Sequence, residues 1–219
     1  GNILDFDNLT EENIYVLDSP ILTNSQLKKF KKFFSKKTKE IDCTFNISSS
    51  LKDRIEEIRE EAETSVREGS TCLILSDKNI SNKRASIPSI LTVGAVHSHL
   101  VKLGLRGYCS LNVECSDALD THSFAILIGV GATTVNPYLA IDSIYQRYEK
   151  KLFGKSDFES CVVKFKKSID AGLLKIMSKM GISVISSYRG GCNFEAVGLS
   201  RAIVSDYFPG MSSRISGIG

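Results

Sequence analysis

Strand-like and helix-like patterns alternate along most of this chain, and that alternation limits the fold more than any other feature. Residues 71–76 read TCLILS, which is largely apolar at both odd and even positions, as in a strand buried on both faces of a parallel sheet. Residues 51–66 instead repeat apolar side chains at helical spacing. A helix between two strands lets them lie parallel, so the pattern predicts an α/β fold with a mostly parallel sheet and flanking helices.

Five strands are predicted in this sheet, which is too few to close a barrel. They fall at residues 41–45, 71–76, 109–115, 132–135 and 182–186. A closed (β/α)₈ barrel needs eight strands and about 250 residues, whereas this chain has 219. We therefore expect an incomplete TIM-barrel-like sheet.

Capping residues indicate where the later helices begin and end. Asn136 and Pro137 are expected to be the N-cap and the first helical position of one helix. The longest helix is predicted to begin at Ser156, with Glu159 completing a capping box. Gly181 is expected to end that helix in the left-handed conformation.

The chain is predicted to be one domain, because no low-complexity linker interrupts residues 1–219. Residues 1–40 are expected to form an N-terminal extension and a basic helix, residues 41–187 the core β/α units, and residues 188–219 C-terminal helices and a linker. The first residue is Gly rather than Met, and the last four lack a helix cap or charged tail. Both ends therefore read as cuts within a longer polypeptide.

The basic helix has one aromatic side and one lysine-covered side. Leu27, Phe30, Phe33 and Phe34 recur on one side, and six lysines between residues 28 and 37 cover the rest. Such a surface can bind RNA or acidic lipid. It can also dock its aromatic stripe on the protein and leave the lysines in water, which is the alternative we favour.

Composition indicates an ordinary globular protein. The net charge of +3 is too small to argue for nucleic acid or a membrane surface, and no apolar run approaches the roughly 20 residues that span a bilayer. The six cysteines form no C-x-x-C pair, so we read them as buried small side chains in a reducing compartment. The expected location is intracellular, in the cytoplasm, with a plastid left open.

Two glycine-rich turns resemble phosphate-binding loops. Residues 129–132 follow an apolar run, but Thr134 stands where a dinucleotide fingerprint has its third glycine. The turn at Arg189, Gly190 and Gly191 follows a predicted strand and precedes a helix, so it can offer amides and a guanidinium to an anion. Turn geometry explains paired glycines more often than ligand binding does, which leaves this turn a weak candidate anion site.

No histidine or carboxylate pattern indicates a complete catalytic or metal site. His97 and His99 lie two apart on a predicted helix and therefore face different sides, which excludes an i, i+4 metal pair. Carboxylates near strand ends are the usual acid–base candidates in α/β folds. Those that fit loosely are Asp42, Asp77, Glu114, Asp142 and Glu195. None can be paired with another from sequence, so no catalytic or metal-binding residue is predicted.

A series of motifs, in order along the chain, resembles the large subunit of glutamate synthase. The strongest is LLKIMSKMGIS at residues 173–183, followed by SYRG at residues 187–190. The others are LDSPIL (17–22), LSDKN (75–79), VGAV (93–96), SFAILIG (123–129), VNPYLA (135–140), FEAVGL (194–199) and SRI (213–215). Because they cover the chain almost from end to end, the chain resembles the central domain of that family.

The resemblance implies a position between a glutamine amidotransferase domain and an FMN-binding synthase domain of the same polypeptide. In this family, ammonia released from glutamine travels through an internal tunnel to 2-oxoglutarate, and the resulting imine is reduced by FMN fed through an iron–sulfur cluster. The central domain resembles the FMN-binding barrel in topology but is not known for holding the flavin. Its implied role is to connect the two active sites and help line the ammonia path.

The resemblance carries no catalytic residue onto this chain, because the catalytic cysteine, the flavin-binding residues and the cluster cysteines belong to other parts of the family. We therefore expect the fragment alone to be inactive and to hold no cofactor. A small subunit or ferredoxin is an implied partner of the parent enzyme. The chain departs from the family pattern in length and at Lys78 and Ser123, where Arg and a second His are common.

Two alternatives come from other functional classes. One is a free-standing module that binds a phosphate or flavin at Arg189, Gly190 and Gly191. The other is an RNA-binding domain that uses the lysines between residues 28 and 37, which we rank last.

Overall fold

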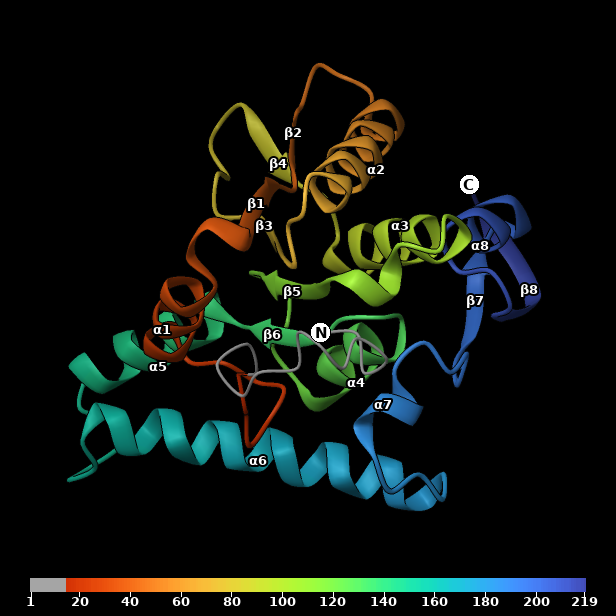
Figure 1. Cartoon of the computed structure of the whole chain (residues 1–219). Coiled ribbons are helices and arrows are strands. Elements are labelled where there is room, and N and C mark those ends of the chain that lie inside the picture. The colour runs from red at the N-terminus through yellow and green to blue at the C-terminus, as the bar shows by residue number, and fades with distance from the viewer. Residues whose placement is uncertain (1–14) are drawn as a thin grey trace, which may run out of the picture.

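The structure, a computed structural model, describes residues 15–219 and is built around a four-stranded parallel sheet (Figure 1). Residues 1–14, the start of the predicted N-terminal extension, lie outside the described residues. The strand order is β1-β3-β5-β6, with bounds Thr38–Asp42, Cys72–Ser76, Ser110–Glu114 and Thr134–Asn136. The predicted α/β fold with a mostly parallel sheet is confirmed, and over residues 15–219 this sheet is open rather than a closed barrel.

One face of this sheet is apolar and carries the main core. The row formed by Ile41, Leu75, Val113 and Val135 is paired across all four strands and is buried. It belongs to the same core cluster as side chains from three helices. These helices are α2 (Leu51–Arg67), α3 (Ser89–Lys102) and α4 (Thr121–Gly129). Full burial of one such aliphatic side chain stabilises the fold by roughly 2 kcal/mol, so this face supplies most of the driving force.

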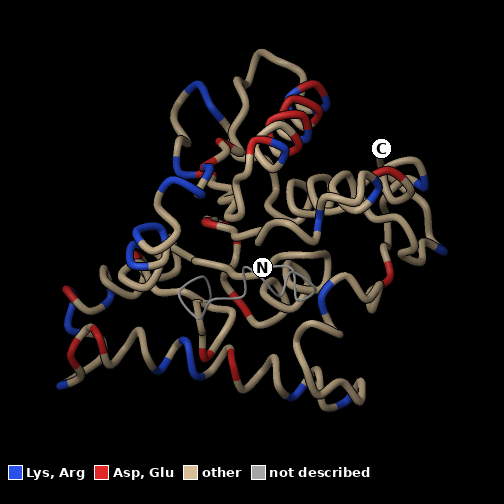
Figure 2. Tube along the Cα trace, in the orientation of Figure 1, with Lys and Arg blue, Asp and Glu red and all other residues tan. Residues whose placement is uncertain are grey.

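Helix α2 is amphipathic, whereas α4 is apolar. Figure 2 shows charges of both signs along α2 and none along α4. Helix α2 begins at the N-cap Ser50, whose side chain accepts a hydrogen bond from the amide of Asp53. Most charged side chains of α2 face water, which is compatible with burial of the opposite side, whereas Arg59 is buried.

The other face of the sheet is polar toward the carboxyl ends of the strands and is covered by α1 (Asn24–Phe34). Leu27 and Phe30 of α1 pack on Cys72 and Ile74 of β3 in a second, smaller core. The N-cap Thr23 forms a complete capping box with Gln26. Leu27, Phe30 and the partly buried Phe34 of the aromatic stripe are therefore docked on the protein, as favoured from the sequence, whereas Phe33 is 43% exposed.

The segment before α1 occupies the outer edge of β6. The amide of Leu22 donates to the carbonyl of Val135 (2.9 Å), and the amide of Val135 donates to the carbonyl of Pro20 (2.8 Å). The predicted fifth strand at residues 182–186 is wrong, because residues 185–188 form the short helix α7 (Ile185–Tyr188). The edge that such a strand would need is already paired with residues 20–22.

Two further helices lie along the border of the molecule and start later than predicted. Helix α6 (Phe158–Lys179) packs against α4 and α5 (Tyr138–Glu149). Its N-cap is Asp157 rather than Ser156, because the Asp157 carboxylate accepts from the backbone amide of Ser160 at 2.8 Å.

Asn136 does not cap α5, contrary to the prediction. It lies in β6 with its side chain fully buried, and its Nδ2 donates to the carbonyl of Leu22 at 2.8 Å. The helix begins only at Tyr138, with Pro137 as a cap that makes no side-chain hydrogen bond. The buried amide of Asn136 is thus used to hold the N-terminal segment.

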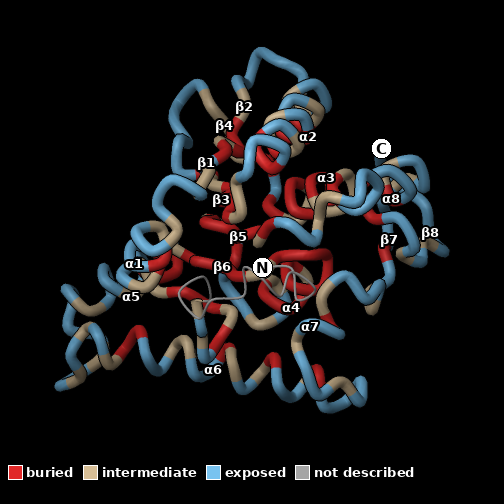
Figure 3. Tube along the Cα trace, in the orientation of Figure 1, coloured by how far each residue is buried: buried red, intermediate tan, exposed pale blue. Residues whose placement is uncertain are grey.

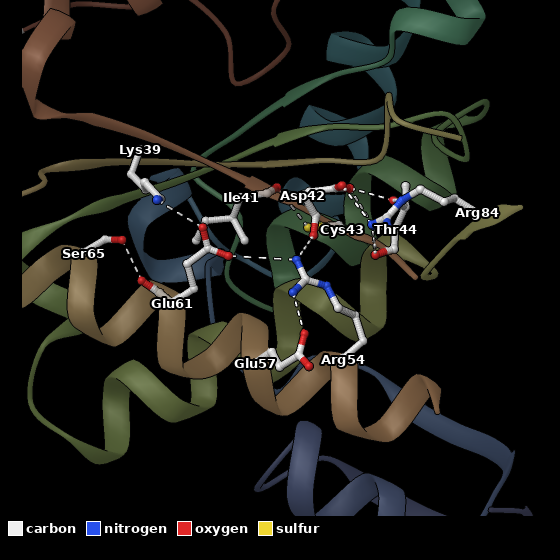
Figure 4. Close-up of polar contacts among 10 residues, drawn as sticks. All are labelled: Lys39, Ile41, Asp42, Cys43, Thr44, Arg54, Glu57, Glu61, Ser65 and Arg84. Carbon is white, nitrogen blue, oxygen red and sulfur yellow. Dashed lines mark hydrogen bonds and ion pairs between the residues drawn. The ribbon is translucent and has the colours of Figure 1, made fainter. Parts of the chain in front are cut away.

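The predicted strand at residues 41–45 is split between two sheets. After β1, β2 (Thr44–Asn46) leaves the main sheet and pairs antiparallel with β4 (Arg84–Ser86). Figure 4 shows the polar contacts at this junction, where Arg84 Nη2 donates to Asp42 Oδ2 at 3.0 Å. Arg54 of α2 donates to the Asp42 carbonyl at 2.7 Å, which fixes the helix to the end of β1.

The C-terminal region contains strands as well as a helix, so the expectation of only helices and a linker over residues 188–219 is wrong. Strands β7 (Glu195–Leu199) and β8 (Ser212–Ile218) pair in parallel around α8 (Arg201–Tyr207). Each strand contains a glycine, which weakens a strand, and β8 also contains three serines, so neither sequence has the dense β-branched and aromatic composition typical of strands.

Contacts with α2 and with α3 hold this unit to the sheet domain. Arg59 of α2 lies over the Tyr207 ring at 4.7 Å and makes an ion pair with Asp206 at 3.2 Å. The ring of Phe208 fills the space that a side chain at Gly94 of α3 would need. Both contacts fix α8 against helices of the main core.

The remaining elements are two short 3₁₀ turns, η2 (Ser35–Lys37) and η3 (Arg106–Tyr108). Among the helices of residues 15–219, none combines the length and apolar character needed to cross a membrane. Five of the six cysteines are buried as predicted, whereas Cys192 is exposed.

Gly181 lies at the end of α6, as the sequence predicts, and its substitution tests this assignment. Its φ is +70° and nothing lies within 4 Å of the position a Cβ would take, so Gly181→Val adds backbone strain without a clash. We expect a loss of about 2 kcal/mol in the free energy of unfolding, measured by urea titration of the chain. Gly107→Val is the control, since Gly107 also has open space but no positive φ. Equal losses in the two variants would contradict the cap assignment.

Candidate functional site at the ends of the parallel sheet

The carboxyl ends of the four parallel strands align four polar residues in one row. Asp42 is paired with Ser76, Ser76 with Glu114, and Glu114 with Asn136. Ligands of open α/β sheets bind at the carboxyl ends of the strands, so this row is where a site is expected. Of the five candidate carboxylates, the structure brings together Asp42, Glu114 and Asp77, the last directly after β3.

The other two candidate carboxylates do not join this cluster. Asp142 lies on α5 and is exposed. Glu195 lies on β7, where its carboxylate is 3.6 Å from Arg214 Nε.

Glu114 is the most buried ion of the row and is held by two lysines. Only 3% of its side chain is exposed, and its Oε1 lies 2.6 Å from Lys78 Nζ. Its Oε2 lies 3.4 Å from Lys31 Nζ and accepts from Ser76 Oγ at 3.0 Å. Burial alone raises the pKa of Glu114, but the hydrogen bond from Lys78 and the charges of both lysines outweigh it. The net result is a pKa below the ordinary value, so the group is ionised at neutral pH.

Asp77 is as buried as Glu114 but is held by neutral donors. Its Oδ2 accepts from the amide of Ser116 at 2.9 Å and from the Ser116 hydroxyl at 2.6 Å, while its Oδ1 is buried without a hydrogen bond. Tyr138 lies nearby, and burial followed by the Asp77 charge raises the pKa of its hydroxyl. That hydroxyl is therefore protonated at neutral pH.

The pKa of Asp42 is also lowered. Burial raises it, but hydrogen bonds from Thr44 and Asn79 and the charge of Arg84 outweigh that effect. A general base works best with a pKa near the working pH, so a buried carboxylate intended for proton transfer should be shifted upward. The shifts of Asp42 and Glu114 are in the opposite direction, which indicates a structural rather than an acid–base role.

The candidate anion site lies near the opposite, amino ends of the strands. Arg189 follows α7, and its Nε donates to the carbonyl of Ala132 at 3.0 Å. The amide of Gly190 donates to the carbonyl of Gly129 (2.8 Å), and that of Gly191 donates to the carbonyl of Tyr188 (3.3 Å). Both amides are thus used inside the protein. An anion at this turn would therefore have to bind through guanidinium groups rather than through these amides. The anion site remains a prediction.

A second arginine, which sequence analysis missed, lies beside Arg189. Arg106 of η3 donates from Nη2 to the carbonyl of Gly131 at 2.8 Å and from Nε to Nδ1 of His97 at 3.1 Å. Burial, together with the charges of Arg106 and Arg189, lowers the pKa of His97 to about 4. His97 is therefore neutral at pH 7 and serves as an acceptor, while His99 faces Glu63 of α2 at 2.9 Å.

The glycines of residues 129–131 are explained by packing. The ring of Phe194 fills the space beside Gly129, and the ring of His97 lies against Gly131, whose φ is +129°. A pocket of about 160 Å³ lies next to Gly129, and its lining includes Gly190, Cys192 and Phe208 but neither arginine. Within residues 15–219, no three His, Cys, Asp or Glu side chains gather as a metal site would need.

Lys31 and Lys78 were also missed as partners of Glu114. Lys31 was counted with the solvated lysines of its helix. Its position four residues after the buried Leu27 was the available signal, because such residues share a helix face. Lys78 follows a predicted strand end, but no local pattern reveals that it reaches β5.

The lysines yield a pH-dependent prediction. The lowered pKa of Glu114 means that its pairing stabilises the fold above its ordinary pKa of 4.5, and this stabilisation is lost as pH falls through the lowered value. Replacing both lysines (Lys31→Met with Lys78→Met) leaves a buried unpaired carboxylate, which should cost about 3 kcal/mol at pH 7. In that variant burial raises the pKa of Glu114, so the loss should shrink on acidification as the carboxylate is protonated. Urea titration between pH 4 and 7 measures both trends.

Lys28→Met with Lys29→Met is the matched control, because both lysines are exposed on the same helix. A cost in the control as large as in the test variant, or a loss that grows on acidification, would contradict the assignment.

Comparison with known proteins places the chain in a family. The family model described as "Glutamate synthase central domain" matches residues 1–200. The chain is 53% identical over its full length to the glutamate synthase [NADPH] large chain of Azospirillum brasilense, of which it covers 15%. It is 41% identical to the Bacillus subtilis glutamate synthase [NADPH] large chain, over 92% of this chain and 13% of that one. It is 38% identical over its full length to a ferredoxin-dependent glutamate synthase of Pyropia yezoensis, covering 15% of it.

The chain thus spans about one seventh of the length of these relatives. Its parallel sheet and flanking helices agree with the fold expected from the resemblance. With the family model over residues 1–200 and identity of 53% to a relative, the chain belongs to the glutamate synthase central-domain family.

Proposed function

We propose that this chain is the central part of a glutamate synthase large subunit, where it connects the glutaminase and FMN-binding parts and helps to form the ammonia path between them. Family membership supports the assignment to that enzyme. The glutaminase and FMN-binding domains of the same polypeptide are its proposed partners. In this proposal FMN and the iron–sulfur cluster are held by other parts of the enzyme, and a small subunit or ferredoxin contacts the parent enzyme.

The observation that carries the connecting role is the pairing of the polar row at the carboxyl ends of the sheet. Glu114 is bound by Lys31 and Lys78, and Asn136 is bound to the segment before α1. These contacts close the end of the sheet where related architectures place substrates. The charges are used to fasten segments together, which suits a domain that aligns its neighbours.

The attachment of the C-terminal unit supports the same role. Arg59, only 7% exposed, donates to the Ala95 carbonyl at 3.3 Å and to the Asp206 carbonyl at 3.2 Å. A buried guanidinium with several acceptors holds one geometry, because its donors form a rigid fork. The unit around α8 is therefore fixed in orientation, as a spacer between two active sites requires.

Isotope transfer in the complete large subunit tests the proposal. Glutamine labelled with ¹⁵N in the amide is supplied with excess unlabelled ammonium, and the glutamate made from 2-oxoglutarate is analysed by mass spectrometry. Channelling predicts that this glutamate keeps the ¹⁵N undiluted. Arg59→Ala should loosen the C-terminal unit and increase dilution several-fold, because ammonia escapes from a misaligned path.

Lys52→Ala is the control, because Lys52 is exposed on the same helix. Dilution of the label in the wild-type enzyme, or equal dilution in both variants, would argue against the role of this chain in channelling.

A second candidate is anion binding at Arg189, favoured by one observation. Arg106 and Arg189 lie close enough for the charge of Arg106 to lower the pKa of Arg189, after burial. Among residues 15–219, no carboxylate forms an ion pair with either arginine. Calorimetric titration with FMN and with inorganic phosphate should give binding that Arg189→Met abolishes. An absence of heat with both would remove this candidate.

A further inference from the structure

Strands β7 and β8 present an apolar side to the surface. Val197 is paired with Ile215, and Leu199 with Ile218, and a register shift between the two pairs accommodates one extra residue of β8. Each exposed apolar side chain of β7 therefore has an apolar partner in β8. Val197 is 63% exposed, Ile215 61% and Ile218 83%. Figure 3 shows most of both strands as exposed.

The inner side of β7 is by contrast part of the main core. Ala196, whose side chain points opposite to that of Val197, is buried. The amide of Ser200 donates to the carbonyl of Ile218 at 2.7 Å, which ties the end of β8 to the start of α8. The strands are therefore ordered on one side and uncovered on the other.

A parallel sheet of two strands with one uncovered face is unusual. Parallel strands occur almost only where both faces are covered, and two strands alone are marginal in water. Contiguous apolar groups on a surface mark contact sites more often than isolated ones do. The side formed by Val197, Leu199, Ile215 and Ile218, called the outer β7–β8 side below, therefore has the features of an interface.

We propose that the outer β7–β8 side is covered, in the intact large subunit, by an apolar segment of the same polypeptide from outside these 219 residues. The inference rests on the proposed function, in which this chain is one part of a longer subunit. The matched region is only 15% of the Azospirillum brasilense relative, so most of such a polypeptide is available to supply the segment.

Charge and connectivity favour this occupant. The charged side chains on the two strands, Glu195 and Arg214, neutralise each other at 3.6 Å, which leaves nothing to attract a nucleic acid or an anionic surface. A segment of the same polypeptide is held at high effective concentration, so a small apolar patch is enough to bind it. A second copy of the chain would have to bind through this patch without that advantage.

Hydrogen exchange in the intact large subunit tests the proposal. The amides of residues 195–199 and 212–218 should exchange slowly in the wild type. Ile215→Asp and, separately, Val197→Asp should accelerate their exchange at least 10-fold, together with that of a segment outside residues 1–219. Ile47→Asp is the matched control, because Ile47 is 64% exposed but lies after β2, and it should leave these rates unchanged.

Three results would overturn the proposal. The amides of both strands would exchange as fast as exposed loops in the wild type, or the accelerated exchange would stay within residues 1–219. Protection that rises with protein concentration would instead identify a second copy as the occupant. If ¹⁵N transfer is undiluted while both strands exchange freely, only this proposal fails, whereas diluted label with protected strands counts against the ammonia path alone.

Discussion

A carboxylate buried at the end of β5 has to be neutralised, and much of the architecture follows from how this is done. Removing Glu114 from water is costly unless opposite charges come with it. The two lysines that supply them are brought by α1 and by the loop after β3, far apart in the sequence. Neutralisation of Glu114 thus requires α1 to lie across the polar face of the sheet. In this position Leu27 and Phe30 of α1 also pack on Cys72 and Ile74.

The sheet consequently has two differently built faces. The face toward α2, α3 and α4 is apolar and stabilises the fold by burial. The face toward α1 contains Asn112, Thr134 and Glu114, whose groups are satisfied by specific partners such as the 2.8 Å hydrogen bond from Thr134 Oγ1 to Asn112 Oδ1. Apolar burial tolerates small shifts, whereas buried polar pairs demand one register. A fixed register of this kind suits the connecting role proposed above.

The elements that could be predicted from the sequence are those that their own residues determine, and those that depend on distant residues could not be predicted. The strand predicted at residues 71–76 and the helix predicted at residues 51–66 were found because the composition and spacing of their own residues define them. The strand expected at residues 182–186 failed because its place at the edge of β6 is taken by residues 20–22, about 160 positions away. In the candidate site, Asp42, Asp77 and Glu114 were recognised as strand-end carboxylates. Their lysine and serine partners depend on strand register, which no local pattern carries.

The pairing of residues 20–22 with β6 has a mechanical consequence. Ile21 runs parallel to Val135, and the Ser19 hydroxyl donates to Asp170 of α6 at 2.6 Å, so this stretch is fastened to both a strand and a helix. A pull along the strand would load its two backbone hydrogen bonds in shear, together rather than in succession. A movement of the chain just before Ser19 would therefore displace the sheet as a rigid body, because no flexible segment of the described chain lies between them.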